Sequence, residues 1–143
     1  MIVADASVFI KLFHAEDGSD AAHALFADAL VRNTEIIAPD VPRYEVLGAA
    51  IHYGAPFSTI TALLDDMKAG GFQVAEPDRE DLILAETIAR TPAPGGGYPD
   101  LFDSIYHAMA INRRGTFVTA DRRHAAKAAS FGAVKLLADW KPD

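Results

Sequence analysis

The chain has 143 residues, of which 50% are hydrophobic and 23% charged, and it carries a formal net charge of −7 and no cysteine. This composition suits a globular chain with a buried core. It excludes a disulfide framework, a thiolate metal site and binding of nucleic acid through a general excess of positive charge. No stretch approaches the ~20 apolar residues that cross a bilayer, and no basic and apolar leader follows Met1. We therefore expect one domain over residues 1–143, a cytoplasmic location and no membrane partner.

Short apolar segments alternate along the chain with longer segments of helical spacing. The short segments predict strands, because each is too short for a helix. Strands that are continuously apolar and joined by helices favour a parallel sheet covered on both faces, which is an α/β fold of the three-layer α/β/α sandwich type. The predicted strands are 2–4, 35–38, 72–75, 116–119 and 134–136, and the predicted helices are 7–14, 18–32, 41–53, 58–69, 78–90, 100–113 and 122–130.

The segment 91–99, TPAPGGGYP, is the one stretch rich in glycine and proline. It follows a helical segment and ends in Tyr-Pro. A P-loop instead needs Gly-Lys-Ser/Thr leading into a helix, and a dinucleotide fingerprint needs G-x-G-x-x-G after a strand. We interpret the segment as a connecting loop that can form the rim of a site.

Two acids follow predicted strands directly. Asp5 comes after the strand 2–4, and Asp121 comes two residues after Thr119, where the strand 116–119 ends. Ligand sites in open parallel sheets lie beyond the carboxyl ends of the strands, so both acids are candidate site residues. Each can equally be the N-cap of the helix that follows, because Asp is a favoured cap. The sequence leaves both interpretations open.

Two further acids lie within predicted helices. Glu45 lies in VPRYEVLGAAI, which is apolar nearly all round, so we expect this helix, and Glu45 with it, to be largely buried. Asp103 lies near the start of an apolar helix, with Asp100 one turn before it and His107 one turn after it. One N-cap cannot account for both Asp100 and Asp103. A buried, ionised carboxylate must be paired, hydrogen-bonded or metal-bound, because an isolated one costs several kcal/mol.

Together, Asp5, Glu45, Asp103 and Asp121 predict a cation site. Several carboxylates in one pocket repel one another unless protons or cations compensate their charge. Hard divalent ions such as Mg²⁺ and Mn²⁺ prefer oxygen ligands. We therefore expect Mg²⁺ or Mn²⁺ as the cofactor.

The ordered set of motifs resembles the PIN-domain family and, within it, the VapC-type toxins of toxin–antitoxin pairs. The matching segments are DAS from Asp5, YEVLGA around Glu45, DSIYHAMA from Asp103 and FVTAD ending at Asp121, and the likeness extends over essentially the whole chain. It implies a parallel five-stranded sheet and a metal-dependent endoribonuclease whose four acids bind one or two Mg²⁺ or Mn²⁺ ions. It also implies an RNA substrate, a homodimer and a cognate antitoxin that covers the active-site groove.

Other side chains near the four acids are candidates for supporting roles. In the resemblance, Ser7 and Thr119 match hydroxyl positions that line or support the site, although the first can simply start a helix and the second can simply pack in a strand. Arg122 and Arg123 directly follow the last acid, and Arg43 lies shortly before Glu45. These arginines are candidates for holding an RNA backbone, and the alternative is that they are solvated surface residues.

Other functions stay open at this point. A PIN-like domain without catalysis can serve as a binding or assembly module. A phosphatase of the aspartyl-phosphate type also has Asp after its first strand, but it needs a second Asp two residues on, where this chain has Ser7. The five histidines share no zinc-binding motif, so we interpret them as structural.

Overall fold

Five parallel strands form the central sheet of the computed structural model, which describes residues 1–142. Their order across the sheet is β3-β2-β1-β4-β5, and all four pairings are parallel. The predicted parallel α/β fold is therefore confirmed, while the predicted domain end at residue 143 lies outside the described residues. The strands are β1 (Ile2–Ala4), β2 (Ile36–Ala38), β3 (Phe72–Val74), β4 (Thr116–Thr119) and β5 (Val134–Leu136).

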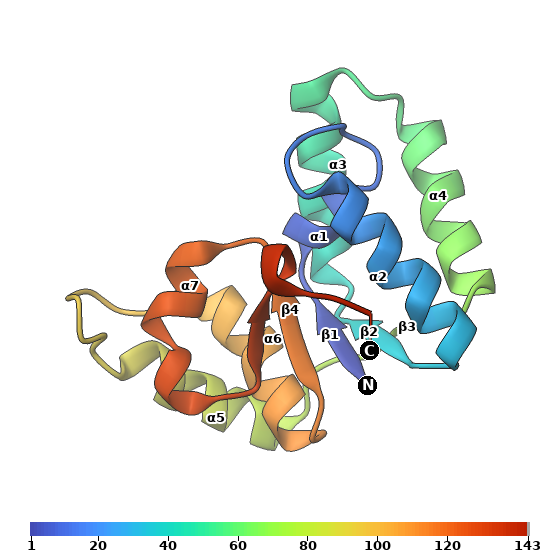
Figure 1. Cartoon of the computed structure of the whole chain (residues 1–143). Coiled ribbons are helices and arrows are strands. Elements are labelled where there is room, and N and C mark those ends of the chain that lie inside the picture. Colours follow the sequence, from blue (N-terminus) through green and yellow to red (C-terminus); the bar gives the residue numbers. More distant parts are fainter. Residues whose placement is uncertain (143) are drawn as a thin grey trace.

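Seven α-helices connect and cover these strands within residues 1–142 (Figure 1). No helix in this part of the chain combines the length and apolar character that crossing a membrane requires. The helices are α1 (Ala6–Ile10), α2 (Ser19–Arg32), α3 (Val41–Tyr53), α4 (Phe57–Ala69), α5 (Arg79–Arg90), α6 (Leu101–Asn112) and α7 (Arg122–Lys127).

Two predicted helices are shorter than expected. The helix predicted for 7–14 ends at Ile10, because the next backbone N–H groups bond three residues back, as in a turn. The helix predicted for 122–130 ends at Lys127 and gives way to a 3₁₀ turn, Ala129–Phe131, before Gly132, whose φ is +69°. In both places the chain must turn to enter the next element.

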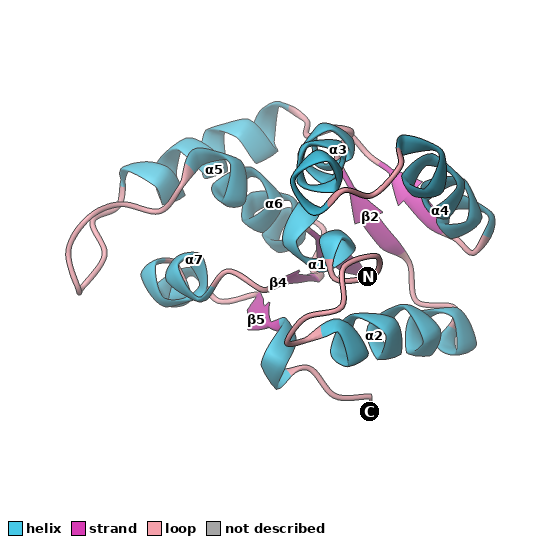
Figure 2. Cartoon of the chain, turned by 90° about the horizontal axis from the view of Figure 1, so that it is seen from above, coloured by secondary structure: helices cyan, strands magenta, loops and turns pink. Residues whose placement is uncertain are grey.

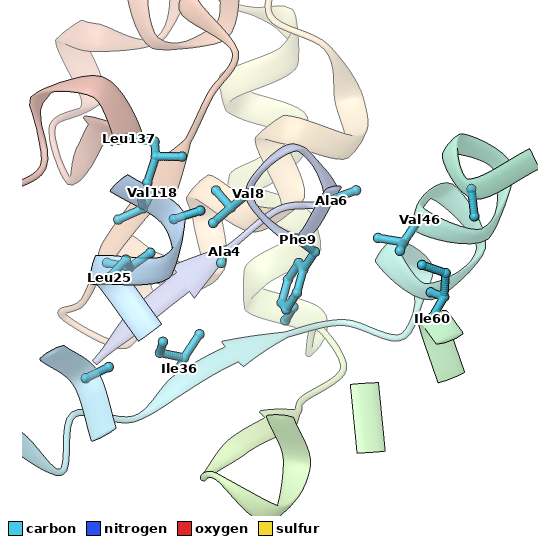
Figure 3. Close-up of a cluster of buried hydrophobic side chains, with 14 residues drawn as sticks. Ala4, Ala6, Val8, Phe9, Leu25, Ile36, Val46, Ile60, Val118 and Leu137 are labelled. Carbon is cyan, nitrogen blue, oxygen red and sulfur yellow. The ribbon is translucent and has the colours of Figure 1, made fainter. Parts of the chain in front are cut away.

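The sheet separates two hydrophobic cores, and alternate strand residues point into each of them. Ala4, Ile36 and Val118 pack with α1 and α2 in the core drawn in Figure 3. Val3, Ile37 and Phe117 pack on the other face, against Tyr106, Met109 and Ala110 of α6. Figure 2 shows α2 and α6 on opposite sides of the strands. This alternation is the period of two that a strand buried on both faces requires, and it confirms the three-layer arrangement.

The strand order places a topological switch between β1 and β4. From β1 the chain moves outward through β2 and β3, and it then returns to the other side of β1 to form β4 and β5. At the start of this pair, a Cβ on Gly115 would lie only 2.9 Å from the carbonyl oxygen of Met1, so the two strands approach closely only because residue 115 is glycine. Ligand sites in open α/β sheets lie at the carboxyl ends of the strands beside such a switch.

Candidate active site

Asp5 lies at the carboxyl end of β1 and is buried, with 4% of its surface exposed. Its Oδ1 accepts hydrogen bonds from the backbone N–H of Ser7 (3.0 Å) and Val8 (3.3 Å) and from the hydroxyl of Ser7 (2.5 Å). Its Oδ2 accepts a hydrogen bond from the hydroxyl of Thr119 (2.5 Å). Burial raises the pKa of Asp5 to about 6, although these hydrogen bonds oppose the shift. Asp5 is thus both the N-cap of α1 and a buried acid at the switch point.

Hydroxyl groups join the ends of β1 and β4. The Thr119 hydroxyl, which donates to Asp5, accepts a hydrogen bond from the backbone N–H of Asp121 (2.9 Å). The Ser7 hydroxyl accepts one from the backbone N–H of Ala120 (2.9 Å). Both side chains therefore contact the first acid and the loop that carries the last one.

Asp121 is the N-cap of α7. Its Oδ1 accepts hydrogen bonds from the backbone N–H groups of Arg123 (2.7 Å) and His124 (3.2 Å). The capping interpretation of Asp5 and Asp121 is correct for both, and both also lie at the carboxyl ends of neighbouring strands. The two interpretations are compatible, because a carboxylate that caps a helix through one oxygen still brings its charge to the end of the sheet.

Asp103 lies in the first turn of α6 but does not cap it. Asp100 is the N-cap, with Oδ1 accepting from the backbone N–H of Phe102 (2.8 Å). Burial and, after it, the negative charges of Asp5, Asp121, Asp100 and Glu45 together raise the pKa of Asp103 to about 7. Asp103 is thus an acid whose pKa is raised by the charges of all three other predicted site residues.

Glu45 departs from the sequence expectation, because it is exposed. The helix α3 is buried only along the stripe that contains Val46 and Ala50, and the opposite side, with Tyr44 65% and Ile51 71% exposed, faces solvent. The expectation that this helix is buried on most faces is therefore wrong. The carboxylate still faces α6, since Oε2 of Glu45 accepts a hydrogen bond from the hydroxyl of Tyr106 (3.3 Å), and partial desolvation raises its pKa.

A polar hollow of about 450 Å³ lies between the start of α6 and α7. Asp103 and Asp121 line it, together with the cationic side chains of Arg123 and Lys127. Its rim includes the end of the 91–99 loop, where the carbonyl of Tyr98 accepts a hydrogen bond from Lys127 Nζ (3.0 Å). The hollow brings carboxylates and cations together at the carboxyl end of the sheet.

The predicted arginines do not act together. Arg123 lines the carboxylate hollow, whereas Arg122, its neighbour in sequence, lines a separate hollow beside β5. Arg43 forms an ion pair with Asp40 and lines a third hollow, of about 250 Å³, between α3 and α4. Among these three arginines, therefore, only Arg123 lines the hollow that contains Asp103 and Asp121.

Two histidines that sequence spacing did not connect lie under this site. His107 of α6 and His124 of α7 are both buried, and their rings are hydrogen-bonded to each other (3.3 Å). The Nδ1 atom of His124 lies 3.9 Å from Oδ2 of Asp103. Burial lowers the pKa of His124 to about 4, and burial also lowers that of His107. No sequence signal joins two residues 17 positions apart on different helices.

The carboxylate oxygens of the site are suitable ligands for a hard divalent cation, although they do not surround a single point. Within residues 1–142, no three His, Asp or Glu side chains are grouped so that they can hold a metal ion. Mg²⁺ does not require such a cage, since it retains several waters and binds through one or two carboxylates plus substrate phosphates. Asp103 and Asp121 in one hollow supply two carboxylates, and their mutual repulsion is what a cation relieves. The residues present therefore fit Mg²⁺ or Mn²⁺.

Comparison with known proteins agrees with this architecture. The family model described as PIN domain matches residues 2–130 of the chain. A crystal structure of PAE2754 from Pyrobaculum aerophilum is similar in fold, with a TM-score of 0.57 at 20% sequence identity over 95% of this chain and 90% of that one. No match was found among curated proteins.

Proposed function

We propose that this chain, which belongs to the PIN-domain family, is a Mg²⁺- or Mn²⁺-dependent endoribonuclease that cleaves RNA phosphodiester bonds. PIN domains are generally nucleases, so hydrolysis of nucleic acid is the activity that the family supports. We further propose that Asp5, Glu45, Asp103 and Asp121 form its acidic site. We also propose that residues 1–143 form one nuclease domain.

The observation that carries this proposal is the position of Asp103. It is neither a cap nor a partner of a cationic Lys or Arg side chain within the described residues, yet the charges of Asp5, Asp121 and Glu45 all act on it. A structural role does not account for a carboxylate placed where it is destabilised by like charge. A divalent cation accounts for it, because a cation reverses the sign of the interaction.

The side chains divide into those that hold the cation and those that hold other groups. Asp103 and Asp121 would bind the cation, which supplies charge neutralisation and an activated water for phosphodiester hydrolysis. Asp5 accepts hydrogen bonds from four donors and so keeps the ends of β1 and β4 together. Its carboxylate also adds negative charge next to the site. Glu45 would complete the acidic set from α3, where its exposed carboxylate acts on Asp103 through its charge. Arg123 would contact a phosphate of the RNA backbone.

We also propose, from the resemblance to VapC-type toxins, that the chain acts in a toxin–antitoxin pair in the cytoplasm. A cognate antitoxin and a homodimer are the partners that this proposal requires. The apolar stripes of α2 and α4 pack against the core, since Leu25 of α2 and Ile60 of α4 are fully buried. Exposed apolar side chains occur on several helices, including Val31 of α2, Ile51 of α3 and Phe102 of α6.

The decisive experiment is cleavage of a mixed RNA pool by the purified chain, free of any antitoxin, with Mn²⁺ or Mg²⁺ and with EDTA. Asp103→Asn tests the site, and Asp66→Asn, which changes an exposed acid on α4, is the matched control. We expect cleavage by the wild type and the control, and loss of cleavage with EDTA or with Asp103→Asn. Metal-dependent cleavage that survives Asp103→Asn would contradict the assignment of this site. Cation binding without cleavage would instead favour a binding or assembly module.

A further inference from the structure

The Nδ1 atom of His124 is buried without a hydrogen-bond partner in the described part of the chain, which is unusual for a histidine in a protein core. It is the one buried side-chain nitrogen or oxygen without a hydrogen-bond partner between residues 1 and 142. The side chain is 1% exposed. Buried polar atoms are nearly always hydrogen-bonded, and an exception calls for a bound water or ion. The atom therefore marks a place where the protein is prepared for a group from outside the chain.

The hydrogen bonds behind the ring decide what Nδ1 can do. The carbonyl oxygen of Gly132 can only accept, so His107 must donate to it from Nε2 (2.5 Å). Both rings are buried without a carboxylate in hydrogen-bonding contact, which favours neutral imidazoles. His107 is then an acceptor at Nδ1, and His124 donates to it from Nε2 (3.3 Å). A neutral imidazole with its proton on Nε2 is an acceptor at Nδ1.

The free acceptor lies beside the carboxylate hollow. His124 lines this hollow together with Asp103 and Asp121, and its Nδ1 lies 3.9 Å from Oδ2 of Asp103. This distance is too long for a direct hydrogen bond, and two acceptors do not bond to each other. A separation of this size between polar atoms is one that a single water bridges. Such a water donates one hydrogen bond to each acceptor, and its oxygen lone pairs then point away from both.

We propose that His124 is a water-positioning residue: its Nδ1 and Oδ2 of Asp103 hold one water whose oxygen is directed at the cation. This inference rests on the proposed nuclease function. His107 and the Gly132 carbonyl fix the tautomer of the His124 ring through their hydrogen bonds. The role differs from that of the four acids, because His124 contributes an oriented neutral acceptor and no charge.

Two substitutions test the roles of Nδ1 and Nε2 of His124 separately. The amide of Gln places a donor where Nε2 of His lies, so His124→Gln retains the hydrogen bond to His107 and lacks the acceptor at Nδ1. The shorter amide of Asn places an acceptor where Nδ1 lies, so His124→Asn retains the acceptor and loses the bond to His107. A merely structural histidine predicts that Gln is the better substitute, whereas a water-positioning histidine predicts that Asn is.

The affinity for Mn²⁺ is measured by the EPR signal of the free ion, with thermal unfolding as a check on folding. Residues that act on a metal through an intermediate group change its affinity by roughly 10- to 100-fold. We expect His124→Gln to weaken Mn²⁺ binding by about tenfold or more, and His124→Asn to stay closer to the wild type. Equal affinities in both variants and the wild type would overturn the inference and leave the nuclease proposal intact. A wild type that neither binds Mn²⁺ nor cleaves RNA would refute both.

The tautomer provides a test that depends on neither a variant nor activity. Long-range ¹H–¹⁵N spectra of the metal-free wild type should show His124 protonated at Nε2 and unprotonated at Nδ1. A proton on Nδ1 would overturn the inference. So would a direct ¹⁴N coupling in the pulsed EPR spectrum of bound Mn²⁺, because His124 would then be a ligand and not the partner of a water.

Discussion

The hydroxyl of Thr119 donates a 2.5 Å hydrogen bond to Oδ2 of Asp5 and thereby ties the carboxyl ends of β4 and β1 together. The same hydroxyl accepts from the backbone N–H of Asp121. One small side chain thus connects two of the four acids. Its position, fully buried at the end of a central strand, makes it a suitable place to test how the site is built.

Replacing Thr119 by Val preserves its shape and removes its hydroxyl. Asp5 then loses one of its hydrogen bonds while it stays buried, and the N–H of Asp121 loses its acceptor. We expect a loss of about 1–3 kcal/mol in the free energy of unfolding. Urea denaturation at constant pH measures it. Thr116→Val on the same strand is the control, because the Thr116 hydroxyl makes no hydrogen bond within residues 1–142, and an equal loss there would contradict the assignment.

The stability of the metal-free protein should fall as the pH rises from about 4 to about 7. Asp103 and Asp5 have folded-state pKa values of about 7 and about 6, both above the ordinary value of 3.8. In this range the unfolded chain has released protons that the folded chain still holds, so raising the pH favours unfolding.

Asp103→Asn should remove much of that dependence. The shift from 3.8 to about 7 corresponds to about 4 kcal/mol, and screening of a side chain that is 19% exposed reduces this to about 2 kcal/mol. At pH 8 without metal, the variant should therefore be more stable than the wild type by about that amount. A variant that is less stable than the wild type at pH 8 would show that Asp103 is stabilising and not repelled.

Arg123 and Arg122 should differ in their effect on RNA, although they are neighbours in sequence. Only Arg123 lines the hollow with Asp103 and Asp121. Arg123→Ala should weaken the binding of single-stranded RNA and reduce the slope of log K against log salt by roughly 0.7, the value for one phosphate contact. Arg122→Ala should leave both nearly unchanged. Fluorescence anisotropy at several salt concentrations measures them, and equal effects would refute a phosphate contact specific to Arg123.

A buried ion pair far from the site should be important for stability alone. Asp81 of α5 is fully buried and accepts hydrogen bonds from Arg113 (2.6 Å) and Asn112 (2.9 Å). Burial alone would raise the pKa of Asp81, but these partners lower it overall. Arg113→Met leaves this carboxylate buried without its cation, and we expect a loss of about 3 kcal/mol.

The pH dependence of this variant provides a further check. Because the folded pKa of Asp81 is lowered, the pair stabilises the fold above pH ~4 and loses that contribution as the pH falls further. The difference between Arg113→Met and the wild type should therefore shrink in acid. Arg90→Met is the control, since it removes an exposed ion pair with Glu86 that should contribute under 1 kcal/mol. Chemical denaturation at pH 7 and pH 3.5 measures both.

Local patterns in the sequence determined the elements and their type. The helix α3 begins and ends where its pattern predicted, at Val41 and Tyr53, and β1 and β4 have their predicted bounds. Periodicity is a local property, and it also located Asp5 and Asp121 near the carboxyl ends of strands. The parallel sheet followed from these elements, because apolar strands joined by helices have few other ways to bury both faces.

Tertiary structure decided which side chains meet and which are exposed. Glu45 lies on an apolar helix yet is exposed, because burial of a helix depends on how many neighbours pack on it, and α3 packs on only part of its surface. Arg122 and Arg123 diverge because successive residues of a helix point about 100° apart. The pairing of His107 with His124 requires α6 and α7 to meet, and no spacing along the chain encodes a contact between two helices.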